Sequence, residues 1–195
     1  FNSVEEIADA KAEIFTGVVP GGHAVLNRDN PFFDRLTAAA RSAGIQNIIS
    51  FGSHEKADVR SERVVLHGTC SCVTADVMCE KLIYKLGLPG EHMVLNSLAV
   101  LAAVKVMGAD VALAALALAV AEAAKGRGVH HHLRIGSGEL LLIDESYNAN
   151  PVSMAAALAL LGRAKTGKGG RRIAVLGDML ELGKDGEALH AELFK

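Results

Sequence analysis

The sequence predicts an α/β fold, and three observations support that prediction. Short apolar runs, which are typical of strands, alternate along the chain with longer segments of helical periodicity. Hydrophobic residues make up 50% of the chain and charged residues 22%, a balance that excludes a disordered protein. Aromatic residues are only 4% of the 195 residues, so Ala, Val and Leu must fill the core.

Charge and cysteine content narrow the class of protein. A formal net charge of -2 argues against a broad nucleic-acid-binding surface. Three cysteines are too few for a disulfide framework and fit a reducing cytosol. The most apolar stretch, residues 111–121, is too short to cross a bilayer, so we expect no membrane insertion. The chain opens on Phe1 at the start of an expected helix, so we expect it to be a piece of a longer protein.

The first elements follow from local signals. Ser3 and Glu6 form a capping-box pattern for a helix that Gly17 can end. Apolar runs then predict strands over residues 23–27 and 47–51, with a helix between them over residues 31–43.

The hydrophobic pattern changes in the middle of the chain. Residues 58–86 alternate over short runs, which predicts a layer of antiparallel hairpins. Helices are expected over residues 91–106 and 110–124. The Gly-rich stretch 125–128 stops the helical block, so we expect a linker there between a domain over residues 1–125 and another over residues 126–195.

The remaining residues predict the opening of a second α/β unit. A hairpin is expected with strands over residues 132–135 and 140–143. Asn150 and Pro151 are a good N-cap and first-turn residue for a helix reaching residue 164. A strand over residues 172–176 and a helix beginning near residue 185 complete the pattern.

Lys11 stands out because helical spacing places it on one face with Val4, Ile7 and Ile14. One interpretation is an aliphatic stem that crosses the apolar face while the ammonium reaches water. The other is a desolvated lysine whose pKa is lowered, so that the neutral amine can react.

Three polar groupings are candidates for chemistry. The string over residues 144–151 joins the end of a strand to the start of a helix, where ligands gather and anions are favoured. A second strand-exit loop over residues 175–183 is rich in carboxylates, with His190 one helix further on. His92 and Asn96 lie four residues apart and share a helix face.

Taken together and in order, these strings resemble the Mur ligase family. The matching segments are 11–17, 26–30, 89–92 with 96–99, 126–128, 143–151 and 175–183 with His190. The resemblance implies the later part of a central ATPase domain, a mixed sheet with helices, followed by the first part of a Rossmann-like C-terminal domain. The phosphate-binding P-loop of the family is missing, since the near match at residues 162–169 ends in Gly and follows a helix.

The resemblance also implies an activity. Family members are ATP-dependent amide ligases that activate a carboxylate as an acyl phosphate, with ATP and Mg²⁺ as cofactors. The branch that this chain resembles adds D-alanyl-D-alanine to UDP-MurNAc-tripeptide, in the bacterial cytoplasm, for peptidoglycan synthesis and hence cell shape and division. We expect a monomer that binds no nucleic acid, and we expect this chain to be inactive alone.

Residue roles carry over from the matching motifs only. Lys11 matches a carbamylated lysine that helps to hold Mg²⁺. Asn96 matches a helix asparagine that contacts the adenine side of ATP, His92 matches the histidine of the same nucleotide-binding motif, and Arg127 matches an arginine that approaches the phosphates. Glu145 and Asn148 are expected to line the nucleotide, and Asp178, Glu181 and His190 to shape the peptide or dipeptide site.

Three alternatives remain open at this point. The chain could belong to a sister Mur ligase that adds a different amino acid, or to a folylpolyglutamate-type synthetase. It could also be a non-catalytic nucleotide-binding module on the same scaffold.

Overall fold

The larger part of the molecule is built on a five-stranded mixed sheet with the order β1-β2-β3-β4-β5. The structure is a computed structural model and describes residues 3–193. β1 and β2 are parallel, as are β2 and β3, whereas β3, β4 and β5 form an antiparallel meander. The strands are β1 (His23–Asn27), β2 (Asn47–Gly52), β3 (Val59–Leu66), β4 (Ser71–Val77) and β5 (Glu80–Leu86). The predicted strands and hairpin layer are therefore confirmed.

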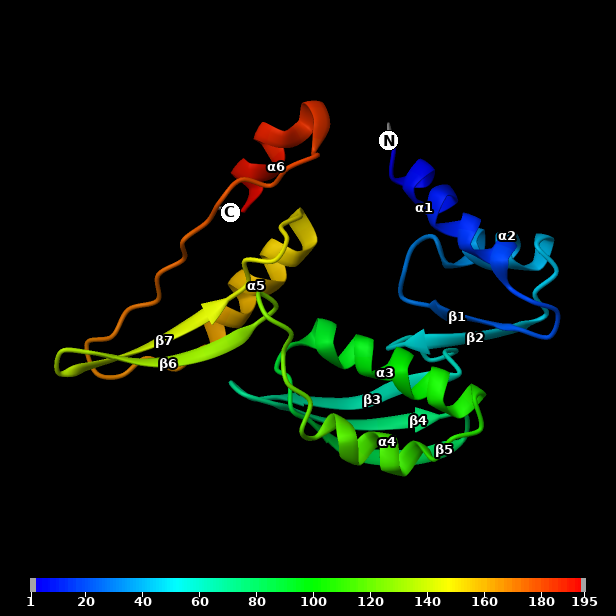
Figure 1. Cartoon of the computed structure of the whole chain (residues 1–195), viewed down its shortest axis with the longest axis horizontal. Coiled ribbons are helices and arrows are strands. Elements are labelled where there is room, and N and C mark those ends of the chain that lie inside the picture. The colour runs from blue at the N-terminus through cyan, green and yellow to red at the C-terminus, as the bar shows by residue number, and fades with distance from the viewer. Residues whose placement is uncertain (1–2, 194–195) are drawn as a thin grey trace.

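Helices flank this sheet (Figure 1). They are α1 (Val4–Ala12), which continues as the 3-10 helix η1 (Glu13–Gly17), α2 (Phe33–Ser42), α3 (Glu91–Val106) and α4 (Val111–Leu118). The Ser3 side chain accepts a hydrogen bond from the Glu6 N–H at 3.2 Å, as an N-cap residue does. Within the described residues, no helix is long and apolar enough to cross a bilayer.

The predicted end of α4 at residue 124 is wrong, because the helix stops at Leu118. The Gly87 N–H donates to the Leu118 carbonyl at 2.9 Å, and the next turn tightens into bonds to the third preceding residue. A side chain at Gly87 would meet the Ala121 carbonyl oxygen at 2.6 Å. This close approach of two backbones ends the helix, and sequence periodicity carries no signal of it.

The main core lies between α3 and the sheet. Leu98 and Leu101 of α3 are completely buried against strand residues such as Val73, Val77 and Leu86. Burial of each such side chain stabilises the fold by roughly 1.5–3 kcal/mol. The α3 helix is thereby fixed on the sheet, and its first turn is held at one end of it.

A smaller core holds α1 and η1 on the edge of the sheet through Phe15, which is buried with Leu26 and Ala40. The face that carries Val4 and Ile14 is exposed instead, at 59% and 73%. The expected apolar face around Lys11 is therefore not buried in this structure.

The C-terminal part contains a separate two-stranded antiparallel sheet. Its elements are β6 (Val129–Ile135), β7 (Gly138–Asp144), α5 (Pro151–Arg163), the 3-10 helix η2 (Gly183–Asp185) and α6 (Gly186–Glu192). Asn150 caps α5 by accepting from the Ser153 N–H, while the Ser153 hydroxyl accepts from the Asn150 N–H. The hairpin, the N-cap and the final helix were all predicted.

The strand predicted over residues 172–176 is wrong. This segment has no regular structure, and the Val175 side chain is 94% exposed. A strand exists only when a neighbour accepts and donates its backbone hydrogen bonds. Among residues 3–193, β6 and β7 pair only with each other, so the segment runs as an extended connection to η2 and α6.

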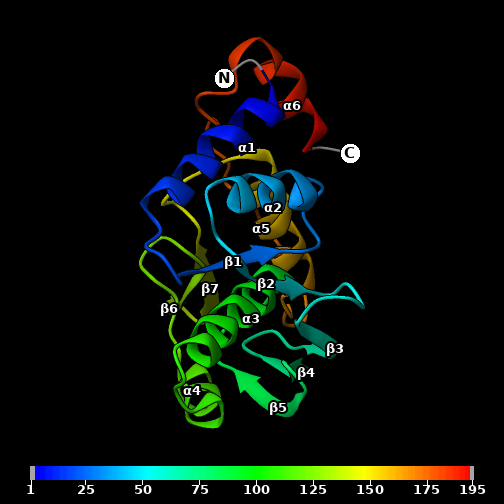
Figure 2. The ribbon, with the colours of Figure 1, turned by 90° about the vertical axis from the view of Figure 1, so that its right-hand side faces the viewer.

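The two parts form arms that meet near the start of α3. α1 and α6 stand at the outer ends of the arms, while α3 and α5 lie near the base (Figure 1). The view in Figure 2 is turned by 90° and shows α3 crossing in front of the sheet. The linker therefore passes close to the first turn of α3, where residues of both parts come together.

Candidate functional site

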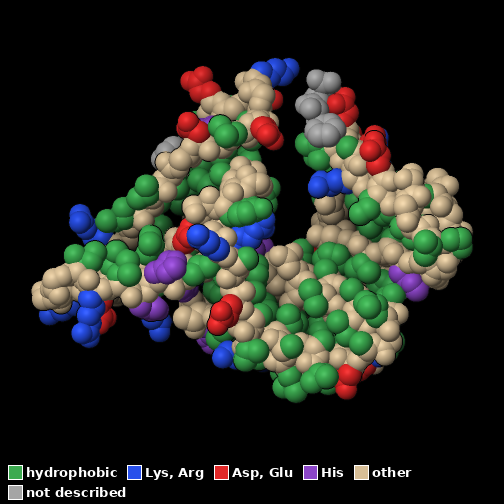
Figure 3. All heavy atoms as spheres, in the orientation of Figure 1, with side chains coloured by type: hydrophobic (Ala, Val, Ile, Leu, Met, Phe, Trp, Pro, Cys, Tyr) green, Lys and Arg blue, Asp and Glu red, His purple; other side chains and the backbone are tan. Residues whose placement is uncertain are grey.

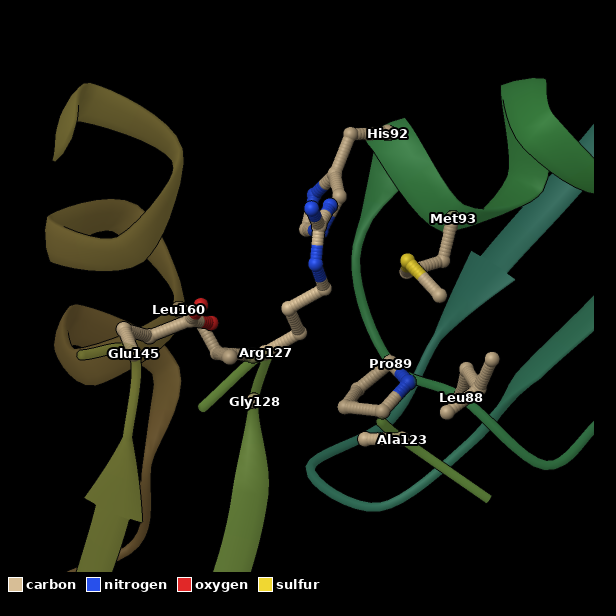
Figure 4. A pocket seen from close by; sticks show the side chains of 9 residues that line it. All are labelled: Leu88, Pro89, His92, Met93, Ala123, Arg127, Gly128, Glu145 and Leu160. Atoms are coloured by element: carbon tan, nitrogen blue, oxygen red, sulfur yellow. The ribbon is translucent and has the colours of Figure 1, made fainter. Parts of the chain in front are cut away.

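A pocket lies where the two arms meet (Figure 4). Its wall on one side comes from the start of α3 and the segment before it, and on the other from the linker, β7's exit and α5. The lining residues are Leu88, Pro89, His92, Met93, Ala123, Arg127, Gly128, Glu145 and Leu160. Three residues singled out in the sequence, His92, Arg127 and Glu145, thus line one pocket from three segments of the chain.

The linker is fastened to the exit of β7. The Tyr147 N–H donates to the Gly126 carbonyl at 3.0 Å, and the Gly128 N–H donates to the Asp144 carbonyl at 2.9 Å. Arg127 lies between these two bonds, with its guanidinium carbon 4.3 Å from the centre of the Tyr147 ring. A cation over an aromatic face is attracted by the ring's quadrupole, so Tyr147 holds the guanidinium in place.

Glu145 and its neighbour Asp144 have opposite environments. Burial raises the pKa of Glu145, the Asp144 charge raises it further, and Arg127 opposes both effects. The pKa of Asp144 is lowered because the Ser146 hydroxyl and N–H donate to its carboxylate at 2.6 and 3.1 Å. Asp144 therefore keeps its charge at a pH where Glu145 still holds its proton.

His92 occupies the first turn of α3, with its ring close to Gly90. Burial lowers the pKa of His92, which favours the neutral imidazole. In Figure 4 the Arg127 side chain extends toward this ring from the opposite wall. Asn96 lies one turn further along α3; it is exposed and lies outside the lining of the pocket, with its amide nitrogen 4.0 Å from the Met93 sulfur.

A second, larger groove runs between β7's exit, α5 and the extended segment. Glu145, Asn148 and Asp178 all contribute to its lining. Glu145 therefore borders both hollows, whereas Glu181 and His190 lie outside the lining of the groove. The structure brings residues of the string over 144–151 and of the loop over 175–183 together in one groove, although no strand precedes the second of them.

Lys11 lies apart from these residues, on α1. The two arms are separated by an open notch (Figure 3), and α1 belongs to the arm across it from α5. Of the two interpretations of Lys11, this structure fits the one in which the ammonium reaches water, because α1 packs through Ala8 and leaves Lys11 exposed. No group of three or more His, Cys, Asp or Glu suited to a metal ion occurs among residues 3–193.

Tyr147 of the groove and Leu160 of the pocket are among the lining residues that the sequence analysis did not single out as site residues. Tyr147 was part of a polar string, and its aromatic ring was the one signal that a cation could stack there. Leu160 is 7% exposed and faces the pocket from the interior of α5. Its sequence context is that of any apolar helix residue, so no signal could have separated it from the core.

Comparison with known families decides the relationship. The sequence profile of the Mur ligase middle domain matches residues 1–104, and that of the Mur ligase glutamate ligase domain matches residues 132–195. The chain belongs to the Mur ligase family.

Individual family members match over nearly the whole chain. The UDP-N-acetylmuramoyl-tripeptide--D-alanyl-D-alanine ligase of Rickettsia prowazekii is 32% identical over 196 residues, which is 99% of this chain and 41% of the relative. This Mur ligase chain thus spans about two fifths of the length of that relative.

Solved structures of Mur ligases give the same result. MurF from Acinetobacter baumannii superposes with a TM-score of 0.86 at 30% identity, covering 99% of this chain and 40% of that one. The MurF ligase of Thermotoga maritima, solved in complex with ADP, has a TM-score of 0.79 at 25% identity, covering 98% and 42%. The predicted fold class is confirmed: part of the middle domain is followed by part of the C-terminal domain.

Proposed function

We propose that this chain is the part of an ATP-dependent amide ligase in which the middle and C-terminal domains meet, with a division at residues 1–125 and 126–195. The reaction that we propose adds D-alanyl-D-alanine to UDP-MurNAc-tripeptide through an acyl phosphate. One observation carries the proposal: His92 on one side of the linker and Arg127 and Glu145 on the other line a single pocket. The names of the relatives support the amine and the acceptor.

The side chains that line the pocket suit a nucleotide, although the hollow itself, at about 10 Å³ in this structure, has room for no more than a water molecule. Leu88, Pro89 and Met93 offer apolar walls, and Arg127 offers a permanent cation that suits phosphate oxygens. Bound ATP supplies the phosphoryl group that activates a carboxylate. His92 and Asn96 would hold the adenine side, and the ADP complex of a relative supports this use of the fold.

On the C-terminal side, Glu145 and Asn148 would border the same nucleotide. Glu145 lines the pocket and the groove together, and Asn148 lines the groove. Arg127 would stabilise the negative charge that builds up on the phosphoryl oxygens, a contribution that is large when water is excluded. The Asp178–Gly183 loop and His190 would shape the site of the amine substrate.

We also propose a magnesium ion as a cofactor. A carbamate on Lys11 would offer hard oxygen ligands of the kind that Mg²⁺ prefers. Among residues 3–193, no group of three or more His, Cys, Asp or Glu is placed to join this carbamate around a metal ion. We place the reaction in the bacterial cytoplasm, in a monomeric enzyme of peptidoglycan synthesis.

Nucleotide binding can be tested on the 195-residue chain itself. We expect Mg-ADP to perturb the amide NMR signals of His92, Arg127 and Glu145, while signals on the outer strand β5 stay unchanged. The same chain should show no ligase turnover. Unchanged signals at all three residues would contradict the nucleotide site, and measurable turnover would contradict the inactivity of the chain.

The amine can be tested in a chimera that carries this chain in place of the matching 41% of the Rickettsia ligase. We expect turnover with D-alanyl-D-alanine and none with L-alanine, meso-diaminopimelate or glutamate. Lys11→Arg should abolish the activity at saturating ATP, because a guanidinium cannot form the carbamate. A preference for another amine would identify a sister ligase, and binding of ADP without turnover would favour a non-catalytic module.

A further inference from the structure

The loop after the extended segment is tied to α6 by one histidine. The Met179 N–H donates to Nε2 of His190 at 2.9 Å, and Nδ1 of the same ring lies 2.7 Å from the Gly186 carbonyl oxygen. Met179 is also the one anchored side chain of the loop, at 4% exposed, while Leu180 beside it is 77% exposed. The loop is therefore fixed at Met179 and open to solvent on either side.

These two contacts select one protonation state of the ring. A backbone N–H can only donate, so Nε2 must be unprotonated to accept from Met179. A carbonyl can only accept, so Nδ1 must carry the proton that it donates to Gly186. Only the neutral Nδ1–H tautomer satisfies both contacts, and it leaves neither ring nitrogen free for a substrate.

The fastened point controls how the loop presents its carboxylates. Asp178 directly precedes Met179 and lines the groove that Glu145 and Asn148 also line. Two residues after Met179, Glu181 adopts a left-handed backbone with φ of 63°, which is unfavourable for a residue with a side chain. Such a conformation persists only where the surrounding structure holds it, and Glu181 lies between the bond at Met179 and the N-cap residue of η2, Leu182.

We propose that His190 is a positioning residue: its Nδ1–H tautomer locks the loop over residues 178–183, so that the Asp178 carboxylate faces the groove. His190 does not itself touch a substrate. The chemistry of the groove, with carboxyl groups from Glu145 and Asp178, suits a ligand that carries an amino group. That last assignment rests on the proposed function, whereas the locking of the loop does not.

The tautomer is measurable in the unmodified chain. Long-range ¹H–¹⁵N NMR spectra distinguish a protonated ring nitrogen from a bare one. At neutral pH we expect His190 to show a protonated Nδ1 and a bare Nε2. An Nε2–H tautomer, or a ring with both nitrogens protonated, would overturn the proposal, and this result requires no variant to fold.

The lock itself is tested by amide hydrogen exchange at Met179. His190→Ala removes the acceptor, and we expect exchange about tenfold faster, as for the loss of one hydrogen bond. His190→Gln offers a side-chain oxygen and should recover part of the protection. Unchanged exchange in His190→Ala would overturn the proposal.

Two controls separate this result from general unfolding. Lys184→Ala alters an exposed residue of the same turn and should leave exchange at Met179 unchanged. Exchange within α5 should stay the same in every variant. Faster amide hydrogen exchange of α5 in both His190→Ala and His190→Gln would show that His190 stabilises the whole fold. That result would overturn the proposal that it fixes the loop locally.

Titration with D-alanyl-D-alanine distinguishes this proposal from the proposed function. We expect the dipeptide to shift the signals of residues 178–183 in the unmodified chain and to bind at least severalfold more weakly to His190→Ala. Equal binding to both would overturn the positioning role. A dipeptide that shifts no signal in the unmodified chain would contradict the proposed amine, while the tautomer and exchange results would still decide the lock.

Discussion

At the scale of single residues, the feature with the most consequence is the pair Asp144 and Glu145. Adjacent carboxyl groups repel each other, so their proton affinities separate. Ser146 donates twice to Asp144 and keeps it ionised, while Glu145 is withdrawn into the junction and faces Arg127. A site that contains both groups holds a charged and a protonatable carboxyl group side by side.

This arrangement predicts how Glu145 titrates. Its pKa should lie above the ordinary value of 4.5 in the unmodified chain. Asp144→Asn should lower the pKa because it removes a negative charge, and Arg127→Gln should raise it because it removes a positive one. ¹³C NMR titration of the side-chain carboxyl measures each value, with Asp34→Asn, at an exposed position on α2, as a control that leaves it unchanged.

The sign of the pH dependence follows from the same shift. A carboxyl group whose pKa is raised by folding binds its proton more tightly in the folded chain than in the unfolded one. Its contribution to stability is therefore present at low pH and is lost as the pH rises from the ordinary value through the raised one. A pKa of Glu145 at or below the ordinary value, or a shift opposite in sign to either prediction, would contradict the assigned environment.

At the scale of secondary-structure elements, α5 begins at a defined residue because its first N–H groups find partners. Asn150 and Ser153 satisfy each other's backbone N–H groups at 2.9 and 3.0 Å, and Pro151 needs no partner at all. This start places the Asn148 end of the polar string next to the groove. The helix cap is therefore part of how the site is held.

Asn150→Ala should lower the free energy of unfolding by about 0.5–2 kcal/mol, because the Ser153 N–H in the first turn loses its acceptor. Urea denaturation followed by circular dichroism measures the loss. Asn150→Ser keeps a capping oxygen and should remain within a few tenths of a kcal/mol of the unmodified chain. Equal stability of all three proteins would show that the cap is not needed.

Elements with local signals were predictable and elements that depend on distant partners were not. The α5 cap and the strand over residues 23–27 carry their own sequence signals, and both were found. The apolar run over residues 172–176 has the composition of a strand but no neighbour that pairs with it. The end of α4 depends on Gly87, more than thirty residues earlier, which helical periodicity cannot register.

The residues of the candidate site also divide into those with a local sequence signal and those whose position depends on distant parts of the chain. Arg127 and Glu145 were accessible from sequence because each lies in a short polar string at an element boundary. Their meeting with His92 was expected only from the family resemblance, since residues 92 and 127 belong to different parts of the chain. Lys11 was placed on an apolar face by spacing alone, whereas the packing of α1 uses Ala8 and Phe15 instead.

At the scale of the whole molecule, the linker connects the two parts without being loose along its length. Gly126 is buried, with a left-handed backbone at φ of 73°, and a Cβ there would lie 2.9 Å from the Tyr147 nitrogen. Only glycine allows both the backbone conformation and this close approach. Gly126 is thus required where the linker joins the exit of β7.

Gly126→Ala should destabilise the chain more than Gly136→Ala. Both positions have a left-handed backbone, which costs roughly 1–2 kcal/mol for alanine. Only Gly126 also has atoms in the way, which should add about 1–3 kcal/mol, whereas nothing lies within 4 Å of a Cβ at Gly136. Urea denaturation measures both variants, and equal losses would contradict the tight contact at Tyr147.

The two backbone hydrogen bonds that flank Arg127 also determine which residues of the pocket move together when the arms move. Gly126 and Gly128 are joined to the strand exit that carries Glu145, so the backbones of Arg127 and Glu145 keep a constant spacing however the two arms are placed. His92 belongs to the other arm and has no such tie. Arg127 and Glu145 therefore lie on one wall of the junction pocket and move together. The position of His92, on the opposite wall, reports how far apart the two arms stand.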